Sequence, residues 1–171
     1  IENGVFKVWY SEVKEQPTKL VYTSTNRPKN VDRGSMNFYT EEDVVTSNNA
    51  DYYRNVWDKG HLAPAATYSD SMENLKQTFS FLNCALQDQY LNRGEWRLLE
   101  EQERVWDDTE NLTITVTLEW NEGFEILPTN GHVPTHMIKE IYFEGTQSCK
   151  RYRFPNEKPT KGWEEYEVPC D

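Results

Sequence analysis

Residues 112 to 120 alternate between apolar side chains and threonine, and this alternation is the feature that most constrains the fold. A period of two places successive side chains on opposite faces of a strand, so the segment is predicted to be a strand with one buried face. Further strands are expected at residues 135 to 143 and 148 to 154. Only one long helical pattern accompanies them, which leaves too few crossover helices for a parallel sheet. The strands are therefore predicted to pair antiparallel.

That helical pattern lies in residues 91 to 106, where leucine, valine and tryptophan form an apolar stripe with arginine, glutamate and glutamine on the other faces. A length of 171 residues is enough for one domain with a real core and too short to argue for two. We therefore predict an α+β fold with a central antiparallel sheet and flanking helices, in a single domain over residues 1 to 171.

The N-terminal half is predicted to contain a hairpin, a long connection and two shorter elements. β-rich runs at residues 4 to 10 and 18 to 25 predict the hairpin. Residues 26 to 51 are polar and contain proline and glycine, which indicates a long irregular connection of the kind that is often functional. Residues 52 to 57 are predicted to form a short strand, and the apolar run at residues 77 to 86 a buried one.

The charge balance restricts how this chain could meet nucleic acid. It has 18 basic and 29 acidic residues, for a net charge of −11. This balance disfavours a protein that coats nucleic acid through a broad basic face, but an enzyme needs only a local cluster of lysine and arginine where a phosphate lies. No apolar run approaches the roughly 18 residues of a membrane-spanning helix, so no membrane partner is expected.

The three cysteines do not have the spacing of a structural zinc site, because no two of them are separated by two to four residues. A disulfide between Cys149 and Cys170, with Cys84 as a buried thiol, is one of the alternatives that the sequence leaves open. Asn111 begins a tripeptide that fits a glycosylation acceptor. These features favour a secreted protein, with an intracellular or organellar location as the alternative.

The residues that could carry chemistry lie between Asp58 and Arg104. His61 is placed at a strand end, and Asn92 opens a helix that carries Glu100 and Arg104 along one side. On an ideal helix Asn92 and Glu100 differ by roughly 80° after full turns, so both can face one site. A neutral amide oxygen as the sole direct protein ligand suits Mg²⁺, which keeps several waters, and a carboxylate can hold those waters.

These motifs resemble the DNA/RNA non-specific endonuclease family of ββα-metal, or His-Me finger, nucleases, and the resemblance covers most of the chain. The matches follow the family's D-R-G-H, N-x-x-x-Q and N-x-x-x-W-x-x-L-E patterns: Asp58, Lys59, Gly60 and His61; Asn83 and Gln87; Asn92, Trp96, Leu99 and Glu100. Residues 133 to 136 and 154 to 156 are similar to stretches around the family's later strands.

The resemblance implies a Mg²⁺-dependent, sugar-non-specific endonuclease that acts on DNA and RNA, with Mn²⁺ or another divalent cation as a possible replacement. In this interpretation His61 is the general base that activates water, and Asn92 is the direct ligand of a single cation that stabilises the leaving group. Glu100 orients water on that cation. Arg104 either faces the phosphate or pairs with Glu100 at i, i+4. The oligomeric state stays open.

The sequence departs from the family pattern at two positions. Lys59 replaces the usual arginine, and an ammonium cannot form the two-pronged contact that a guanidinium makes with phosphate. Phe79 stands where some members have a supporting asparagine. Arg33, in a polar loop, could supply the arginine that relatives bring from an upstream loop. Asn83 is expected to contact the substrate or support the site.

Other interpretations compete with this one. His132 and His136 are read as structural histidines, and Asn92 taken alone could be a helix N-cap. The substitutions at Lys59 and Phe79 would also suit a catalytically weakened nucleic-acid-binding relative of the same fold. A secreted interaction module using exposed aromatic residues is a third possibility. The joint presence of His61, Asn92 and Glu100 disfavours both alternatives to the nuclease.

Overall fold

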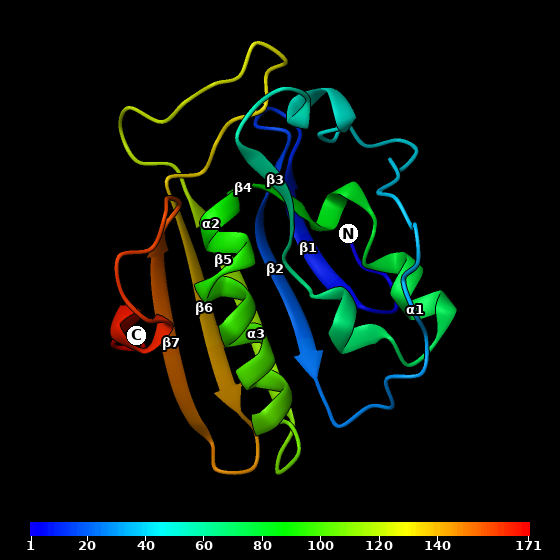
Figure 1. Ribbon diagram of the computed structural model, residues 1–171, viewed down its shortest axis with the longest axis vertical. Helices are drawn as coiled ribbons and strands as arrows, with labels where there is room; N and C mark the ends of the chain where they lie inside the picture. Colours follow the sequence, from blue (N-terminus) through cyan, green and yellow to red (C-terminus); the bar gives the residue numbers. More distant parts are fainter.

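A six-stranded antiparallel sheet runs through the molecule in the order β1-β2-β5-β6-β7-β8 (Figure 1). The computed structural model describes residues 1–171. The strands are β1 Phe6–Ser11, β2 Gln16–Ser24, β5 Leu112–Glu119, β6 His136–Phe143, β7 Ser148–Pro155 and β8 Glu167–Val168. The predicted N-terminal hairpin, the three later strands and their antiparallel pairing are confirmed.

The side-chain pattern of strand β5 explains why one face of the sheet is buried. Its side chains are alternately buried and half-buried along all eight residues, and the buried set is Leu112, Ile114, Val116 and Leu118. The threonines between them face the other side of the sheet, where β-branched side chains fit a pleated, partly exposed surface. The sheet therefore has one face in the core and one facing solvent.

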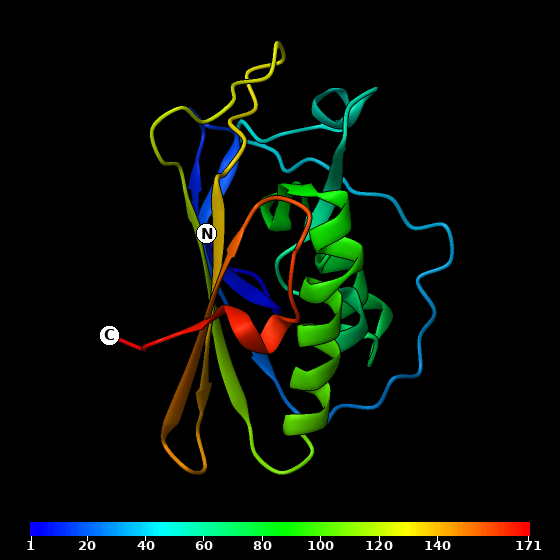
Figure 2. The same ribbon diagram turned by 60° about the vertical axis from the view of Figure 1, so that its left-hand side comes forward.

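The core face is covered by helices and by a second, smaller sheet. Figure 2 shows the large sheet nearly edge-on, with α2 (Gln89–Arg93), α3 (Glu95–Trp106) and strand β3 all on one side of it. Trp96 and Leu99 of α3 are fully buried against the sheet. The long connection after β2 passes over the outer side of this helical layer.

The small sheet is a two-stranded antiparallel hairpin of β3 (Trp57–His61) and β4 (Cys84–Asp88), followed directly by α2. This arrangement is the predicted ββα element. The strand predicted at residues 52 to 57 is wrong, because residues up to Tyr52 form the 3₁₀-helix η1 (Asn49–Tyr52). Asn48 caps that helix, and Arg54 has a left-handed backbone with φ of 53°, which interrupts an extended chain.

The apolar run at residues 77 to 86 is also not one strand. It begins at the end of α1 (Met72–Gln77), continues through the 3₁₀-helix η3 (Phe81–Asn83) and only then enters β4. Ser80 caps η3 by accepting a hydrogen bond from the Leu82 amide. In a continuous apolar run the side chains show neither the alternation of a strand nor the stripe of a helix. The sequence pattern therefore does not distinguish a buried strand from a short helix. Two further 3₁₀-helices are η2 (Ala65–Tyr68) and η4 (Trp163–Tyr166).

The single helix predicted over residues 91 to 106 is divided in two at Gly94, whose backbone has φ of −110° and ψ of −112°. Asp88 caps α2 by accepting hydrogen bonds from the amides of Tyr90 and Leu91. Asn92 is therefore neither the opening residue of a helix nor an N-cap, and the interpretation of Asn92 as a cap is wrong. The angle expected between Asn92 and Glu100 on one ideal helix does not apply.

Replacing Gly94 with alanine is expected to destabilise the protein by about 1–3 kcal/mol. A Cβ at this position would lie 2.5 Å from the Tyr90 carbonyl oxygen, and that backbone atom cannot move without shifting α2. Urea denaturation of the Gly94→Ala variant and the wild type measures the difference. The Gly162→Ala variant, which changes a glycine with φ of −69° and only a 3.6 Å contact at the added Cβ, separates this close contact from a general glycine effect. A Gly94→Ala variant as stable as the wild type would contradict the prediction.

Cys149 and Cys170 form a disulfide that ties the C-terminal residues to β7, and Cys84 is a buried thiol. This disulfide, with Cys84 as a free thiol, is the alternative that the sequence left open. None of the helices has the length and apolar character needed to cross a membrane.

Candidate functional site

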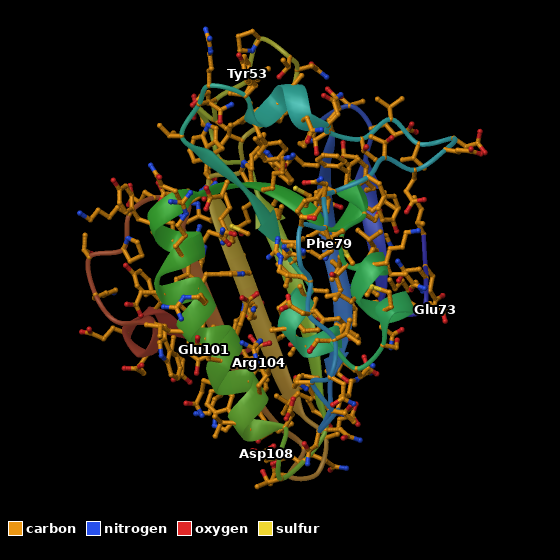
Figure 3. All side chains as sticks on the ribbon, turned by 45° about the vertical axis from the view of Figure 1, so that its right-hand side comes forward. Tyr53, Glu73, Phe79, Glu101, Arg104 and Asp108 are labelled. Atoms are coloured by element: carbon orange, nitrogen blue, oxygen red, sulfur yellow. A yellow bond between two sulfur atoms is a disulfide. The ribbon has the colours of Figure 1, made fainter.

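A cleft of about 580 Å³ opens between the end of β3, the loop after β2 and the two helices α2 and α3. Figure 3 shows Phe79 on one side of this region and Glu101 and Arg104, from α3, on the other. The charged and polar residues that line the cleft are Arg33, Asn37, Asp58, Lys59, His61, Asn92, Arg93, Arg97, Glu100, Glu101 and Arg104. All six residues that the sequence predicted to be catalytic or metal-binding line this cleft: Arg33, Lys59, His61, Asn92, Glu100 and Arg104.

His61 is the last residue of β3, paired across the hairpin with Cys84. The rings of Phe38 and Phe79 lie 4.6 and 4.7 Å from its imidazole, and its Nε2 is buried without a hydrogen-bond partner. Burial, with a smaller effect of the Arg33 charge, lowers the pKa of His61 to about 3. The imidazole is therefore neutral at neutral pH and can accept a proton.

The stability of the protein is expected to fall as the pH drops from about 6.5 toward about 3. The pKa of His61 is lower in the folded than in the unfolded state. As the pH falls over this range, the unfolded chain binds the proton first and is stabilised relative to the folded protein. The stability supplied by neutral His61 is present above pH 6.5 and is lost on acidification, on the order of 2–4 kcal/mol. Thermal melts of wild type and a His61→Ala variant from pH 7 to 4 isolate this effect from other groups. Parallel losses in the two proteins would contradict the prediction.

Asn92 is held in one orientation by Asp58. Its Nδ2 donates to Asp58 Oδ2 at 2.9 Å, and Arg93 contacts both oxygens of the same carboxylate at 2.8 and 2.9 Å. No protein donor contacts the Asn92 Oδ1. Because the amide nitrogen is engaged with Asp58, the amide oxygen is the atom left for a ligand in the cleft.

Glu100 lies on α3 with its Oε2 buried and without a hydrogen-bond partner. Burial raises the pKa of Glu100 to about 7, with an opposing effect of the buried Lys139 charge. Glu100 makes no ion pair with Arg104, whose Nη1 is directed to the Thr67 hydroxyl at 3.4 Å. Of the two alternatives for Arg104, the i, i+4 pair is therefore absent, and its guanidinium lines the cleft.

The cleft concentrates positive charge in a strongly acidic chain. Arg93 and Arg97 are paired with carboxylates, Asp58 and Glu101. The three remaining cations of the cleft have no carboxylate partner, and they are the three predicted from sequence: Arg33, Lys59 and Arg104. Unpaired cations in one hollow can attract a phosphate group even where the net charge of the chain is negative.

Arg33 and Lys59 are each held by a neighbouring group. The Arg33 guanidinium lies over the Phe79 ring, 4.8 Å from its centre. Lys59 Nζ donates to the Asn49 side chain at 2.6 Å. The phenylalanine that replaces the family's asparagine thus forms an apolar wall shared by Arg33 and His61.

Asn83 lies outside the cleft and is completely buried. Its side chain accepts a hydrogen bond from the Ala63 amide at 2.7 Å and donates to the carbonyl oxygens of Ala63 and Thr78. These bonds engage both the nitrogen and the oxygen of the amide, and they hold the segment that directly follows His61 in place. Asn83 is in the position of a supporting residue, without access to a substrate. His132 and His136 also lie outside the cleft.

Several cleft residues were given no role from the sequence. Asp58 is the first position of a motif that gives it no role of its own, and no motif includes Asn37, Arg93 or Arg97. Arg97 could have been found from its i, i+4 spacing to Glu101. The contact between Asp58 and Arg93 joins residues 35 positions apart, and no local pattern predicts it.

The donors present fit a hard divalent cation. Asn92 Oδ1 has no protein partner, and the Glu100 carboxylate has a buried oxygen that lacks one. Oxygen atoms of this kind are the ligands that Mg²⁺ and similar ions prefer.

The chain is similar in sequence to a known protein family and to two of the proteins reported below. A family model described as DNA/RNA non-specific endonuclease matches residues 2–171. Mitochondrial endonuclease G of Bos taurus is 30% identical over 142 residues, which is 72% of this chain and 48% of that protein. Mitochondrial nuclease EXOG of Xenopus laevis is 31% identical over 150 residues, 77% of this chain and 42% of that protein. The chain thus spans less than half the length of these two relatives.

A solved structure of a complex between EndoG and EndoGI has the same fold. It superimposes with a TM-score of 0.88 and 24% identity, over 99% of this chain and 79% of the matched chain. The predicted α+β fold is confirmed by this similarity.

Proposed function

Because this chain belongs to the DNA/RNA non-specific endonuclease family, we propose that it hydrolyses phosphodiester bonds of DNA and RNA with the help of a divalent metal ion. One observation carries the proposal. A neutral histidine with a buried, unpartnered Nε2 and an asparagine with an unpartnered Oδ1 line the same cleft as three cations that lack carboxylate partners. Contacts to phosphate and sugar carry no base sequence information, and they account for activity on both nucleic acids.

In this proposal His61 takes the proton from the attacking water, because its neutral imidazole is the free base at the pH of the reaction. Arg33, Lys59 and Arg104 bind the non-bridging oxygens of the phosphate and align it for in-line attack. Lys59 offers a single point charge, so it positions the phosphate less rigidly than arginine would.

Asn92 Oδ1 would hold the metal ion directly, and Glu100 would hold water beside it. Such an ion, when bound, supplies Lewis-acid stabilisation of the negative charge on the phosphate and the departing 3′ oxygen. We propose Mg²⁺, because the two donors are oxygen atoms and few in number, with Mn²⁺ as a substitute. Asp58 and Arg93 keep the Asn92 amide turned toward the cleft.

We propose that residues 1–171 act as one nuclease domain in an oxidising compartment of the cell. The relatives are named as mitochondrial proteins, which favours the organellar alternative over secretion. The Cys149–Cys170 disulfide favours an environment that keeps thiols oxidised. Mass spectrometry of the protein isolated without reduction from its native source tests the disulfide, and subcellular fractionation of the same source tests the compartment.

The metal requirement can be tested with plasmid DNA and RNA in the presence of Mg²⁺, Mn²⁺ or EDTA. We expect cleavage of both substrates with either metal and none with EDTA. Asn92→Ala should lower cleavage at least about 100-fold and weaken Mn²⁺ binding, measured by electron paramagnetic resonance. The matched control is Asn111→Ala, which removes an exposed asparagine that lines no part of the cleft.

Retained cleavage in EDTA would overturn the metal requirement. Nucleic-acid binding without cleavage, with Mg²⁺ present, would instead favour the weakened relative that the substitutions at Lys59 and Phe79 suggest.

A further inference from the structure

A second, more apolar pocket of about 280 Å³ lies directly beside the cleft. The two hollows share three residues, Arg33, Ala65 and Ala66. Ala65 and Ala66 begin the 3₁₀-helix η2, four and five residues after His61. Both alanines have only a methyl side chain, and because the two hollows share these lining residues, the pocket lies within reach of a molecule bound in the cleft.

The pocket is lined by both apolar and polar residues. Its walls include Val31, Leu75 and the two alanines, and its polar groups other than Arg33 are Asp32 and Ser69. One oxygen of Asp32 accepts a hydrogen bond from the Gly34 amide at 2.8 Å, and the other has no partner. Apolar walls together with one unpartnered carboxylate oxygen suit an aromatic ring that carries an amino or ring N–H group.

Hydrogen bonds hold the walls of the pocket in place. The amides of Asn30 and Val31 both donate to the Ser69 carbonyl at 2.9 Å, which fastens the loop wall to the end of η2. Ser69 Oγ donates back to the Ala66 carbonyl. A preformed pocket does not pay the ordering cost of a loop that closes on its ligand.

We propose that this pocket binds one unstacked nucleobase of the strand being cut, next to the scissile phosphate, an inference that rests on the proposed nuclease function. Arg33 borders both hollows, so the residue that meets the phosphate also meets the attached nucleoside. A pocket somewhat smaller than the roughly 300–1,000 Å³ of drug-sized ligand sites suits a single base. The Asp32 acceptor favours bases that carry an amino group, cytosine above all.

Single-stranded nucleic acid is therefore the preferred substrate. A base in a duplex must be unpaired and unstacked before it can enter the pocket, and this costs a few kcal/mol, least where the strand is already single.

The test uses a variant that fills the pocket and leaves the cleft unchanged. Val31 lines the pocket and no part of the cleft, so Val31→Trp blocks base entry without touching the proposed catalytic groups. Val31→Leu fills less of the space and serves if the larger side chain prevents folding. Val13→Trp is the matched control, because Val13 is 74% exposed and lines neither hollow.

Two single-stranded DNA decamers with Mg²⁺ provide the readout. One carries all its bases, and the other has the same sugar-phosphate backbone with stable abasic residues throughout. Wild type and Val13→Trp are expected to cleave the base-bearing strand at least about tenfold faster in kcat/KM. Val31→Trp, checked for folding by circular dichroism, should cleave both strands at the slow abasic rate, and Val31→Leu should fall between.

The outcomes separate the pocket from the proposed function. Equal rates on the two strands for wild type, or a Val31→Trp variant that keeps the wild-type preference for bases, would overturn the base pocket while nuclease activity stands. A wild type that cleaves neither strand contradicts the proposed function and, with it, the pocket.

Discussion

A His61→Ala variant is expected to lose about 10²- to 10⁴-fold in the rate of phosphodiester cleavage. The imidazole is neutral, borders the cleft and has an unpartnered buried nitrogen, so it is the group best placed to take a proton from water. Single-turnover rates on a labelled single-stranded oligonucleotide, with Mg²⁺ and enzyme in excess, measure the loss without interference from product release.

A matched control and a chemical rescue separate catalysis from structure. His136→Ala removes a half-buried histidine that lies outside the cleft, and this variant should keep the wild-type rate. Added imidazole should restore part of the activity of His61→Ala, because a small base can enter the space left by the side chain. A His61→Ala variant that keeps more than a tenth of the wild-type rate would show that another group removes the proton.

A Lys139→Met variant is expected to lower the free energy of unfolding by about 3–5 kcal/mol. Lys139 and Glu103 are both completely buried, and Lys139 Nζ lies 2.8 Å from Glu103 Oε2. The Tyr22 hydroxyl donates to the other oxygen of Glu103, and the Lys139 ammonium lies 4.3 Å from the centre of the Trp96 ring. Methionine keeps the length of the side chain but leaves the Glu103 carboxylate buried without a cation.

A double-mutant cycle tests this interpretation of the pair. Adding Glu103→Gln to Lys139→Met removes the stranded charge and keeps an oxygen that can accept the hydrogen bond from Tyr22. The double variant should recover at least about half of the lost stability, because neutral polar groups are less costly to bury than an unpaired charge. Urea denaturation gives the four free energies. A single variant that loses less than about 1 kcal/mol would contradict the prediction.

The elements that sequence predicted correctly are those with a clear local period. The alternation in β5 and the apolar stripe of α3 repeat over several residues, and each pattern specifies which face is buried. The failures lie where one residue changes the backbone. Gly94 divides a stripe that continues across it, and Arg54 turns a segment of strand-forming residues before Trp57. A periodic pattern of side chains carries no information about such single backbone angles.

The sequence by itself determined the α+β class, the antiparallel pairing, and, through the resemblance of the motifs around His61 and Asn92, the family and the residues to examine. Only the tertiary structure decided that Asp58 turns the Asn92 amide, that Arg33 meets Phe79 beside His61, and that Lys139 is buried against Glu103. The physical reason is distance along the chain. Periods and motifs describe neighbours in sequence, whereas orientation, burial and charge depend on residues 34 to 46 positions apart that meet only when the sheet and helices pack.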